Sequence, residues 1–398
     1  MPDTLFIEPC NFEDFPVGGQ LSFAKQMIRT FGSRLALVGI STDETPVGRW
    51  VKRAFDGTVC DFFSVDRWRA SAHKPIVPRR IRAYYCIKQY RWQILSADIR
   101  SAFISSPEAL LASYRWGWKS VCFLCSGIEN PLHMSRYKWA KFLASPLESR
   151  LISVMQSVDL LLAAADETAI KKFAAKTGGR ISKESIISFP TRADTDIFQP
   201  TDQTAVREKL GVPKEVPVFV NVGRLNWGKG WDLLIEAFHL LLRSRGDAHF
   251  YFVGDGEDRR EIELKLQEHG LFEQVHITGY LDSRGVAAYL NAADVFVLGS
   301  HFEGWPTVMV EALATGKAVV STSVSAAAEL IENGENGYIV GHRDAGLFCE
   351  AMVRALSLDA RSYSLEKSRP YALNRLAEDL GRLWAPLRMT KDSQCSLH

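Results

Sequence analysis

Short apolar runs alternate with longer helical patterns along almost the whole chain, and this alternation limits the possible folds more than any other feature. Each run is β-rich and continuously apolar, as in "RLALVGIS", "VPVFVNVG" and "HFYFVGDG". Strands that are apolar on both sides and separated by helices are typical of parallel sheets that helices cover on both faces. The pattern therefore predicts an α/β protein, with more strands than one sheet holds comfortably.

A proline-rich segment near the middle of the chain predicts where the domains divide. Residues 190–217 contain four prolines and little apolar periodicity, and a chain of 398 residues is longer than one hydrophobic core usually supports. We therefore expect two doubly wound, Rossmann-like domains that face each other across a cleft, at residues 1–190 and 191–368. An amphipathic helix within 369–388 is expected to pack back toward the first domain, and residues 389–398 are expected to fray.

The composition excludes several classes of protein. Apolar residues make up 46% of the chain and charged residues 24%, which is typical of a globular rather than a disordered protein. The formal net charge of +2 gives no global electrostatic support for nucleic-acid binding. The seven cysteines are odd in number and scattered, and the first residues do not resemble a signal peptide, so we expect a reducing, cytoplasmic location.

Cys122 and Cys125 have the spacing of a redox or metal-binding pair, in "SVCFLCSG". In a strand, however, residues three positions apart point to opposite faces. The sequence also offers no second Cys or His pair that would complete a zinc site. We therefore predict two buried thiols and no metal at this place.

No apolar run reaches the roughly 20 residues that cross a bilayer, so no membrane span is expected. Arg79 to Leu95, "RRIRAYYCIKQYRWQIL", nevertheless mixes basic with aromatic and aliphatic residues at helical spacing. This composition suits a helix at a membrane interface. The alternative is a helix that turns its apolar side inward and leaves its basic face in solvent.

Two glycine-containing loops that follow apolar strands carry candidate binding residues. In "FVNVGRLNWGKGWDLLIEAF", Gly223, Arg224 and Lys229 lie between a strand and a helix. Ligands of parallel α/β sheets bind outside the carboxyl ends of the strands, so these two cations form a candidate pyrophosphate clamp; cations that are merely solvated are the alternative. Gly254, in "FYFVGDGEDR", either lets the backbone approach a ligand or makes a tight turn.

A third loop places two carboxylates at the start of a helix. In "HFEGWPTVMVEALATG" the helix is expected to span about 306–315, so that Glu303 precedes it and Glu311 lies on its second turn. The amides of Thr307 and Val308 would hold a phosphate, and the acids would accept hydrogen bonds from sugar or ribose hydroxyls. A surface helix with a Glu at either end is the alternative, but Glu311 lies in an apolar stretch where a lone carboxylate is costly.

Five motifs of the second half resemble, in the same order, the C-terminal domain of retaining GT-B glycosyltransferases of the group 1 or family 4 type. They are "VGRLNWGKGWDLLIEAF", "FVGDGEDR", "ITGYL", "YLNAADVFVLGSHFEGWPTVMVEALATGKAVVSTS" and "AELIENGENGYIV". The resemblance covers roughly Val216 to Val340. It implies that the substrate is a nucleotide-diphosphate sugar and that neither a cofactor nor a metal is needed.

The resemblance also implies a role for each residue of the site. Arg224 and Lys229 would hold the diphosphate, Glu303 the hydroxyls of the transferred sugar, and Glu311 the ribose. Arg224, Lys229 and Glu303 would be catalytic, since breaking the anomeric bond leaves negative charge on the diphosphate, which preplaced cations stabilise. The remaining donor-binding positions would be Gly223, Gly254, Tyr280, Gly304, Thr307 and Val308.

The first half resembles the family less closely. "FPVGGQLSFAKQM" is similar to the family's N-terminal glycine loop, which implies that Gly18 and Gly19 lie near the diphosphate. Family members often carry a His-Gly after a strand of this domain, whereas here Ser126 occupies the matching place. His133 is a candidate replacement for that imidazole, and Arg136 is a candidate contact to donor or acceptor.

These features predict a retaining, metal-independent glycosyltransferase that moves a sugar to a saccharide or lipid-linked acceptor, in polysaccharide or glycolipid biosynthesis. A lipid-linked acceptor would bring the protein to the inner face of the membrane. Because of Ser126, a catalytically degenerate nucleotide-sugar binding or scaffold protein remains an alternative, and a sugar-nucleotide epimerase is another. Asp194 and Asp196 form an Asp-x-Asp, but the segment resembles the family's interdomain linker, so we predict no metal there.

Overall fold

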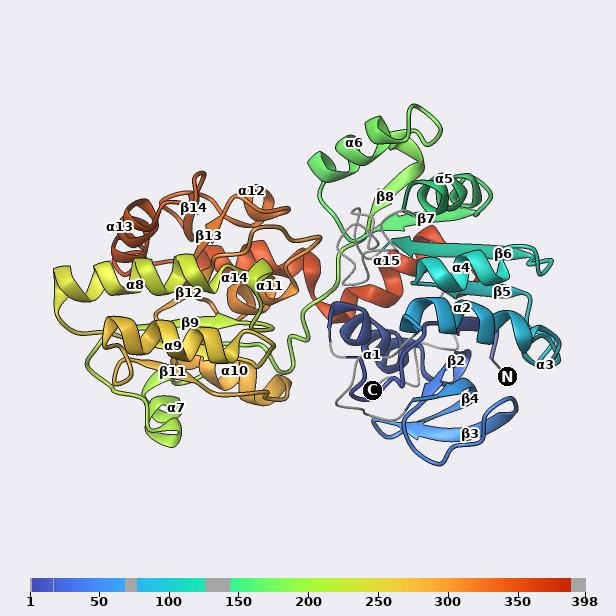
Figure 1. Cartoon of the computed structure of the whole chain (residues 1–398), viewed down its shortest axis with the longest axis horizontal. Helices are drawn as coiled ribbons and strands as arrows, with labels where there is room; N and C mark the ends of the chain where they lie inside the picture. Colours follow the sequence, from blue (N-terminus) through green and yellow to red (C-terminus); the bar gives the residue numbers. More distant parts are fainter. Residues whose placement is uncertain (1, 17, 69–76, 126–143, 388–398) are drawn as a thin grey trace. The chain divides into compact units, whose positions relative to one another are not determined.

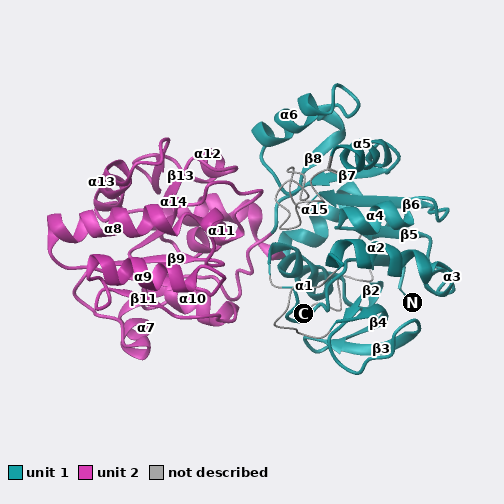
Figure 2. Cartoon of the chain, viewed as in Figure 1, with its two compact units in different colours: residues 1–191, 374–398 teal, residues 192–373 magenta. Residues whose placement is uncertain are grey.

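The computed structural model describes residues 2–16, 18–68, 77–125 and 144–387. The chain forms two compact units (Figure 2): unit 1 is Met1–Thr191 with Asn374–His398, and unit 2 is Arg192–Leu373. Each unit contains its own sheet of mainly parallel strands between helices (Figure 1). The predicted α/β class with two Rossmann-like domains is therefore confirmed.

The sheet of unit 1 has eight strands in the order β3-β4-β2-β1-β5-β6-β7-β8. The strands are β1 (Thr4–Ile7), β2 (Leu35–Ser41), β3 (Trp50–Phe55), β4 (Thr58–Arg67), β5 (Ser101–Ile104), β6 (Ser120–Cys125), β7 (Leu160–Ala163) and β8 (Ile186–Ser188). All neighbours pair in parallel except β3 and β4, which form an antiparallel hairpin at the edge. The strand order reverses between β1 and β5, as in a doubly wound sheet.

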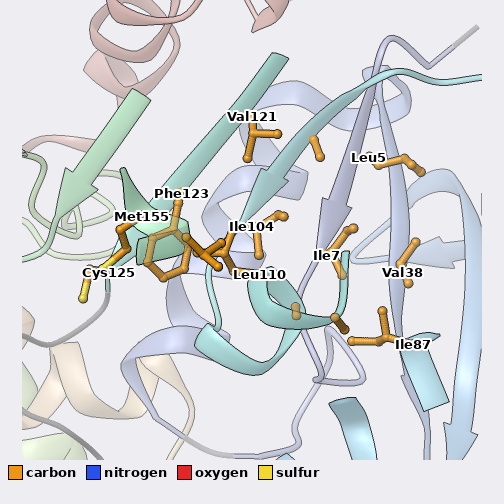
Figure 3. Close-up of a cluster of buried hydrophobic side chains, with 14 of the residues drawn as sticks. Leu5, Ile7, Val38, Ile87, Ile104, Leu110, Val121, Phe123, Cys125 and Met155 are labelled. Atoms are coloured by element: carbon orange, nitrogen blue, oxygen red, sulfur yellow. The ribbon is translucent and has the colours of Figure 1, made fainter. Parts of the chain in front are cut away.

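Alternate residues of the strands in unit 1 pack on opposite faces of the sheet. Leu5 and Ile7 of β1 lie in a buried cluster with Ile87, Leu110 and Met155, which come from three different helices (Figure 3). The helices of unit 1 are α1 (Gly19–Phe31), α2 (Arg79–Gln89), α3 (Arg91–Leu95), α4 (Pro107–Ser113), α5 (Ala144–Met155), α6 (Glu167–Lys176) and α15 (Leu376–Leu383). Helices α2, α4 and α5 therefore cover this face.

The opposite face of the same sheet is built from aromatic rings. Phe6, between the two aliphatic residues of β1, contacts Phe103 of β5. Phe103 in turn contacts Phe23 of α1 and Trp384, which follows α15. A strand that is buried on both faces needs apolar residues at every position, which explains the continuous apolar runs in the sequence.

The two cysteines of β6 follow the same alternation. Cys125 belongs to the cluster of Figure 3, together with Phe123, whereas the buried Cys122 points to the other face of the sheet. The two thiols are therefore separate buried side chains, as the sequence predicts.

The sheet of unit 2 has six parallel strands in the order β11-β10-β9-β12-β13-β14. The strands are β9 (Val218–Val222), β10 (His249–Val253), β11 (Val275–Ile277), β12 (Val295–Leu298), β13 (Ala318–Thr322) and β14 (Gly337–Val340). This is the strand order of the Rossmann fold, and its direction reverses between β9 and β12. In open parallel sheets, ligands bind at such a switch point, outside the carboxyl ends of the strands.

Helices cover both faces of the second sheet. They are α7 (Gln203–Leu210), α8 (Trp231–Arg245), α9 (Arg259–His269), α10 (Ser283–Ala292), α11 (Thr307–Ala314), α12 (Ala327–Leu330), α13 (Ala345–Ala355) and α14 (Arg361–Ser368). Helices α8, α9 and α13 share a buried cluster with the sheet, while α10 and α11 pack on its strands from outside that cluster. The site described below lies where β9 and β12 lead into α8 and α11.

The amphipathic helix predicted within residues 369–388 does not extend over the whole range, because an extended pairing with Ala193 precedes it. The amide of Leu373 donates to the Ala193 carbonyl and the amide of Ala193 donates to the Tyr371 carbonyl, both at 2.8 Å. Pro370 has no amide hydrogen, and the extended pairing with Ala193 replaces helical hydrogen bonds at this point. The amphipathic helix is confined to α15, which belongs to unit 1.

Within the part of the chain that the structure describes, no helix combines the length and apolar character that crossing a bilayer requires. The stretch from Arg79 to Leu95 forms α2 and α3, and α2 buries Ala83 and Ile87. One face of this helix is therefore turned inward, as expected for a helix that packs its apolar side against the protein and leaves its basic face in solvent.

Candidate functional site

Three loops of unit 2 are joined by backbone hydrogen bonds at the carboxyl ends of β9, β10 and β12. The Gly223 amide donates to the Val253 carbonyl at 3.0 Å, and the Leu225 amide donates to the Asp255 carbonyl at 3.0 Å. On the other side, the His301 amide donates to the Gly228 carbonyl at 2.9 Å. The loop that carries Arg224 and Lys229 is therefore held between its two neighbours, at the switch point of the sheet.

Glycines make this close packing possible. A Cβ atom on Gly230, which has a φ of +67°, would lie 1.8 Å from the Gly299 carbonyl oxygen, and one on Gly254 would lie 2.0 Å from the Gly223 carbonyl oxygen. No side chain fits at either place. The sequence indicates a close approach at Gly254, and the structure identifies the approaching group as neighbouring backbone.

Each of the two predicted cations is paired with a carboxylate. Arg224, whose side chain is 60% exposed, donates from Nε to Glu257 Oε2 at 2.7 Å. Lys229 donates from Nζ to Glu303 Oε1 at 2.7 Å. The aliphatic part of Lys229 passes over Gly223, since its Cε is 3.9 Å from the place of a Cβ there. Both cations therefore lie at the tip of β9, as predicted.

Glu303 is held by two donors at one oxygen. Its side chain is 11% exposed, and Oε1 accepts from Lys229 and from the Ser300 hydroxyl, the latter at 2.6 Å. Among the described residues, none donates to Oε2. The carboxylate is thus fixed in place with one oxygen still able to accept hydrogen bonds from a ligand.

Glu311 lies inside α11, where its carboxyl makes no hydrogen bond or ion pair with any described residue. Burial raises its pKa to about 7, and the charge of Asp194 acts in the same direction. A buried carboxyl without a partner is costly unless a ligand supplies one. Glu311 is therefore a second acceptor that the folded chain leaves unused.

The start of α11 matches the prediction only in part. The helix spans Thr307–Ala314, one residue shorter at each end than expected, and Gly316 follows it with a φ of +74°. The Thr307 amide is already used, because it donates to the Trp305 carbonyl at 3.0 Å. The Val308 amide has no such partner in the described chain, so one of the two expected amides is available for an anion.

Two aromatic side chains, Trp227 and Tyr280, lie in loops at the same edge of the sheet as the cations. Trp227 stacks on His301 with ring centroids 3.9 Å apart, and burial together with the nearby Arg343 lowers the pKa of His301. Tyr280 is 64% exposed and follows Gly279, whose backbone pairs with Gly254. The structure therefore brings Tyr280 to the same edge of the sheet as the other predicted residues.

Three residues of the site are absent from the sequence prediction. Ser300 and His301 precede Glu303, and Glu257 lies in the glycine turn "GDGED". Glu257 carries a detectable signal, since a carboxylate beside two glycines at a strand end is a candidate partner for a cation. Nothing in the local sequence distinguishes Ser300 or His301 from ordinary loop residues.

The remaining predicted residues lie in unit 1, outside the described residues, or in the loop that also carries Glu303. Gly18 and Gly19 belong to unit 1, where Gly18 caps α1 and a Cβ on either would meet no other atom within 4 Å. Ser126, His133 and Arg136 lie outside the described residues. Gly304 lies in the loop between β12 and α11.

The Asp-x-Asp of the interdomain segment forms a turn. The Asp194 carboxylate accepts from the Asp196 amide at 3.2 Å, and the Asp194 carbonyl accepts from the amides of Ile197 and Phe198. Across residues 2–387, apart from the undescribed gaps, no group of three or more His, Cys, Asp or Glu side chains is arranged to hold a metal.

The comparison with known proteins agrees with this geometry. Residues 202–370 match the family described as "Glycosyl transferases group 1". A curated relative, the lipopolysaccharide core biosynthesis glycosyltransferase LpsE of Rhizobium meliloti, is 34% identical over 146 residues, which are 37% of this chain and 41% of the relative. The chain spans between 39% and 52% of the length of the curated relatives that it matches.

Solved structures match the whole fold. Sucrose-phosphate synthase from Thermosynechococcus elongatus has a TM-score of 0.75 at 17% identity, over 97% of this chain and 99% of the other. HepE of Anabaena, solved in complex with UDP and glucose, has a TM-score of 0.71 at 17% identity, over 96% and 99%. Both likenesses concern the fold. Residues 202–370 of this chain are thus similar to the group 1 glycosyl transferases, and the whole chain has the two-domain GT-B fold of these solved structures.

Proposed function

We propose that this protein is a retaining glycosyltransferase, which moves a sugar from a nucleotide-diphosphate donor to a saccharide or lipid-linked acceptor. The observation that carries the proposal is the Lys229–Glu303 pair at the switch point of unit 2, beside Arg224. Two cations and one positioned carboxylate at the tips of β9 and β12 suit a ligand that is anionic at one end and rich in hydroxyls at the other.

The proposed mechanism depends on charge that develops during the reaction. When the anomeric bond breaks, negative charge accumulates on the diphosphate and positive charge on the sugar ring. Arg224 and Lys229 would stabilise the departing diphosphate, and the free oxygen of Glu303 would accept hydrogen bonds from the sugar hydroxyls. Because side chains supply the positive charge, we propose that the reaction needs neither a metal nor a cofactor.

The nucleoside end of the donor would lie along α11 and β11. Glu311 has an unused carboxyl that suits the ribose hydroxyls, and the exposed Tyr280 suits the base. The complex of HepE with UDP and glucose supports a donor of this class. LpsE, a lipopolysaccharide core glycosyltransferase, supports a role in polysaccharide or glycolipid biosynthesis.

A lipid-linked acceptor would require contact with a membrane surface, on its cytoplasmic side. Helices α2 and α3 support such contact, because they combine basic residues with exposed aromatic ones. Sugar transfer to a water-soluble analogue and to the same sugar on a lipid, measured in parallel, would distinguish the two acceptor classes.

A thermal-shift screen of nucleoside diphosphates and their sugars would first identify the base, because a ligand that binds the folded state raises the melting temperature by mass action. Transfer and donor hydrolysis are then measured with the selected donor. Glu303→Gln and Lys229→Ala should each lower the rate by about 100-fold or more. Lys214→Ala is the control, because Lys214 is also ion-paired, at 3.0 Å from Glu208, but lies outside the site.

Each alternative gives a different result. A degenerate binding protein would show the thermal shift with no turnover in the wild type. An epimerase would convert the sugar of the donor without any acceptor. Activity that is unchanged in both site variants would exclude the proposed mechanism, and a product with inverted anomeric configuration, read by NMR, would exclude retention.

A further inference from the structure

A groove of about 830 Å³ lies in unit 1 between helices α2, α4 and α5. It has the volume of a small-molecule binding site. Its lining is mainly apolar and aromatic, and includes Ile81, Tyr84 and Tyr85 of α2, Leu111 of α4, Trp116 of the segment after α4, and Leu147 of α5. Figure 1 shows these three helices on the same side of the first sheet. All of the residues named in its lining belong to unit 1.

Cations line this groove without carboxylate partners. The five basic side chains of its lining make no ion pair with any described residue: Arg80, Lys88, Arg91, Arg115 and Arg150. Several other cations of unit 1 are ion-paired, such as Arg82 with Asp66 at 2.6 Å and Lys176 with Glu148 at 2.9 Å. An excess of unpaired positive charge around one cavity indicates an anionic ligand.

Four of these cations lie over aromatic rings instead: Lys88, Arg91, Arg115 and Arg150. Arg150 donates to the Tyr114 hydroxyl and lies over that ring, with its Cζ 5.4 Å from the centroid. Lys88 donates to the Tyr84 hydroxyl at 3.3 Å. Such contacts orient a cation without neutralising its charge.

The described lining of the groove carries little negative charge. Among the described residues that line the groove, Glu108 is the one carboxylate, and burial raises its pKa, against the effect of Arg80. The Nε of Arg91 is buried and has no hydrogen-bond partner among the described residues. The groove therefore has an unsatisfied donor as well as unpaired charge.

Large apolar side chains are exposed at the rim. Tyr85 is 64% exposed, Trp92 next to the groove residue Arg91 is 72% exposed, and Leu147 of α5 is also exposed. Exposed aromatic residues next to cations are typical of surfaces that meet the head-group region of a bilayer.

We propose that this groove binds a phosphate-bearing membrane lipid. Its apolar chain would lie against Ile81, Leu111 and Leu147, and its phosphate would meet the unpaired cations. Charge complementarity favours this occupant, because the lining combines an apolar floor with several cations and a single carboxylate. A soluble phosphate would leave the apolar floor uncovered, and a neutral lipid would leave the cations unpaired. The proposal goes beyond the transferase activity and does not depend on it.

Vesicle flotation of the full chain tests this proposal. The protein should float with phosphatidylcholine vesicles that contain phosphatidylglycerol and should remain at the bottom with phosphatidylcholine alone. The Lys88→Gln/Arg91→Gln variant should bind about 30-fold more weakly, since each basic residue near an anionic surface contributes about 1 kcal/mol. Tyr85→Ser/Leu147→Ser should also bind more weakly, because the chain loses its apolar contact.

The matched control is Arg100→Gln/Lys171→Gln, which removes two exposed cations of unit 1 that are ion-paired with Asp98 and Glu167. This variant should float like the wild type. Failure of the wild type to float would overturn the proposal, as would equal loss in the control or full binding by the Tyr85→Ser/Leu147→Ser variant. Glycerol phosphate that binds the groove as strongly as vesicles do, and so prevents flotation, would also overturn the proposal. The groove would then bind the phosphate alone.

The same preparations are tested for nucleoside diphosphate binding, which reports on unit 2. Normal nucleotide binding by the groove variants shows that they are folded. If the wild type floats but binds no nucleotide, the proposed transferase function fails and the lipid groove stands. If the wild type binds nucleotide but does not float, the lipid groove fails and the proposed transferase function stands.

Discussion

At the scale of single residues, the two carboxylates that the sequence predicts for the site are in different states. Glu303 is paired with Lys229, a residue 74 positions away, whereas Glu311 has no partner in the described part of the chain. The sequence could identify both acids and the lysine from motif order, but it could not show that they would pair, because that contact depends on two loops from different strands. Ser300 completes the arrangement and has no sequence signal of its own.

The titration of Glu311 predicts how donor binding depends on pH. Burial raises its pKa to about 7, so the carboxyl becomes protonated as the pH falls through that value and accepts fewer hydrogen bonds. Donor affinity of the wild type should therefore fall below about pH 7. Calorimetric titration at about one pH unit on either side measures the change. Glu311→Gln should bind more weakly than ionised wild type and lack this step, and an identical pH profile in both proteins would contradict the role.

Glu8 predicts a pH dependence of stability in unit 1. Its buried carboxyl accepts from the Ser105 hydroxyl at 2.6 Å, and burial raises its pKa to about 8 from 4.5. As the pH rises across this window, the unfolded chain loses the proton while the folded chain keeps it. The free energy of unfolding should therefore fall, by an amount on the order of a few kcal/mol.

The Glu8→Gln variant should lack this loss, so its stability relative to the wild type should improve as the pH rises. Urea unfolding at several pH values measures the difference. Glu184→Gln, at an exposed position, serves as control and should follow the wild type. If the free energies of unfolding of Glu8→Gln and the wild type differ by the same amount at every pH, the carboxyl of Glu8 is not buried in its protonated state.

At the scale of elements, the strands were more predictable than the loops. Each parallel strand coincides with an apolar run in the sequence, because burial on both faces requires it. Strand β3 differs: "WVKRAF" alternates because it lies at the edge of the sheet and has one exposed face. The Asp56-Gly57 turn that joins it to β4 has positive φ at both residues, a strong hairpin signal that a search for continuous apolar runs does not use.

The loop packing at the switch point predicts the effect of a single methyl group. Gly230→Ala would place a Cβ 1.8 Å from the Gly299 carbonyl oxygen and must push the two loops apart. Gly246 also has a positive φ, but a Cβ there meets nothing within 4 Å. Both variants should lose about 1–2 kcal/mol of stability from the left-handed backbone, and only Gly230→Ala should also weaken nucleotide binding.

Equilibrium unfolding and nucleotide titration of the two variants give this comparison directly. Equal nucleotide affinity in both would show that the loop spacing at β9 and β12 does not shape the site.

At the scale of the whole molecule, the chain passes from unit 1 to unit 2 and returns. The proline-rich segment and the chain length indicate two domains, and the amphipathic pattern within 369–388 predicts a returning tail, but the pattern does not show that unit 1 resumes at Asn374. Trp384 is the anchor: it is buried, contacts Phe103, and donates from Nε1 to the Ser120 hydroxyl at 2.8 Å. The last described segment therefore belongs to the core of unit 1.

Removing this anchor should destabilise unit 1. Trp384→Ala is expected to cost about 3–5 kcal/mol, the usual range for a buried tryptophan. Trp92→Ala, which removes an exposed tryptophan of the same unit, should change stability little. Calorimetry separates the effects if the two units unfold at different temperatures. Bound nucleotide should raise the melting temperature of unit 2, whereas Trp384→Ala should lower the melting temperature of unit 1. Similar losses in the two variants would mean that the tail is not part of the core.

The central claim is that Arg224 and Lys229 at the switch point of unit 2 recognise a diphosphate. Its most direct test is calorimetric titration of the wild type, the Arg224→Ala/Lys229→Ala variant and Lys214→Ala with the nucleoside diphosphate selected by screening and with its monophosphate. We predict that the wild type and Lys214→Ala prefer the diphosphate by about tenfold or more, and that the double variant loses this preference. An undiminished preference in the double variant would contradict the claim.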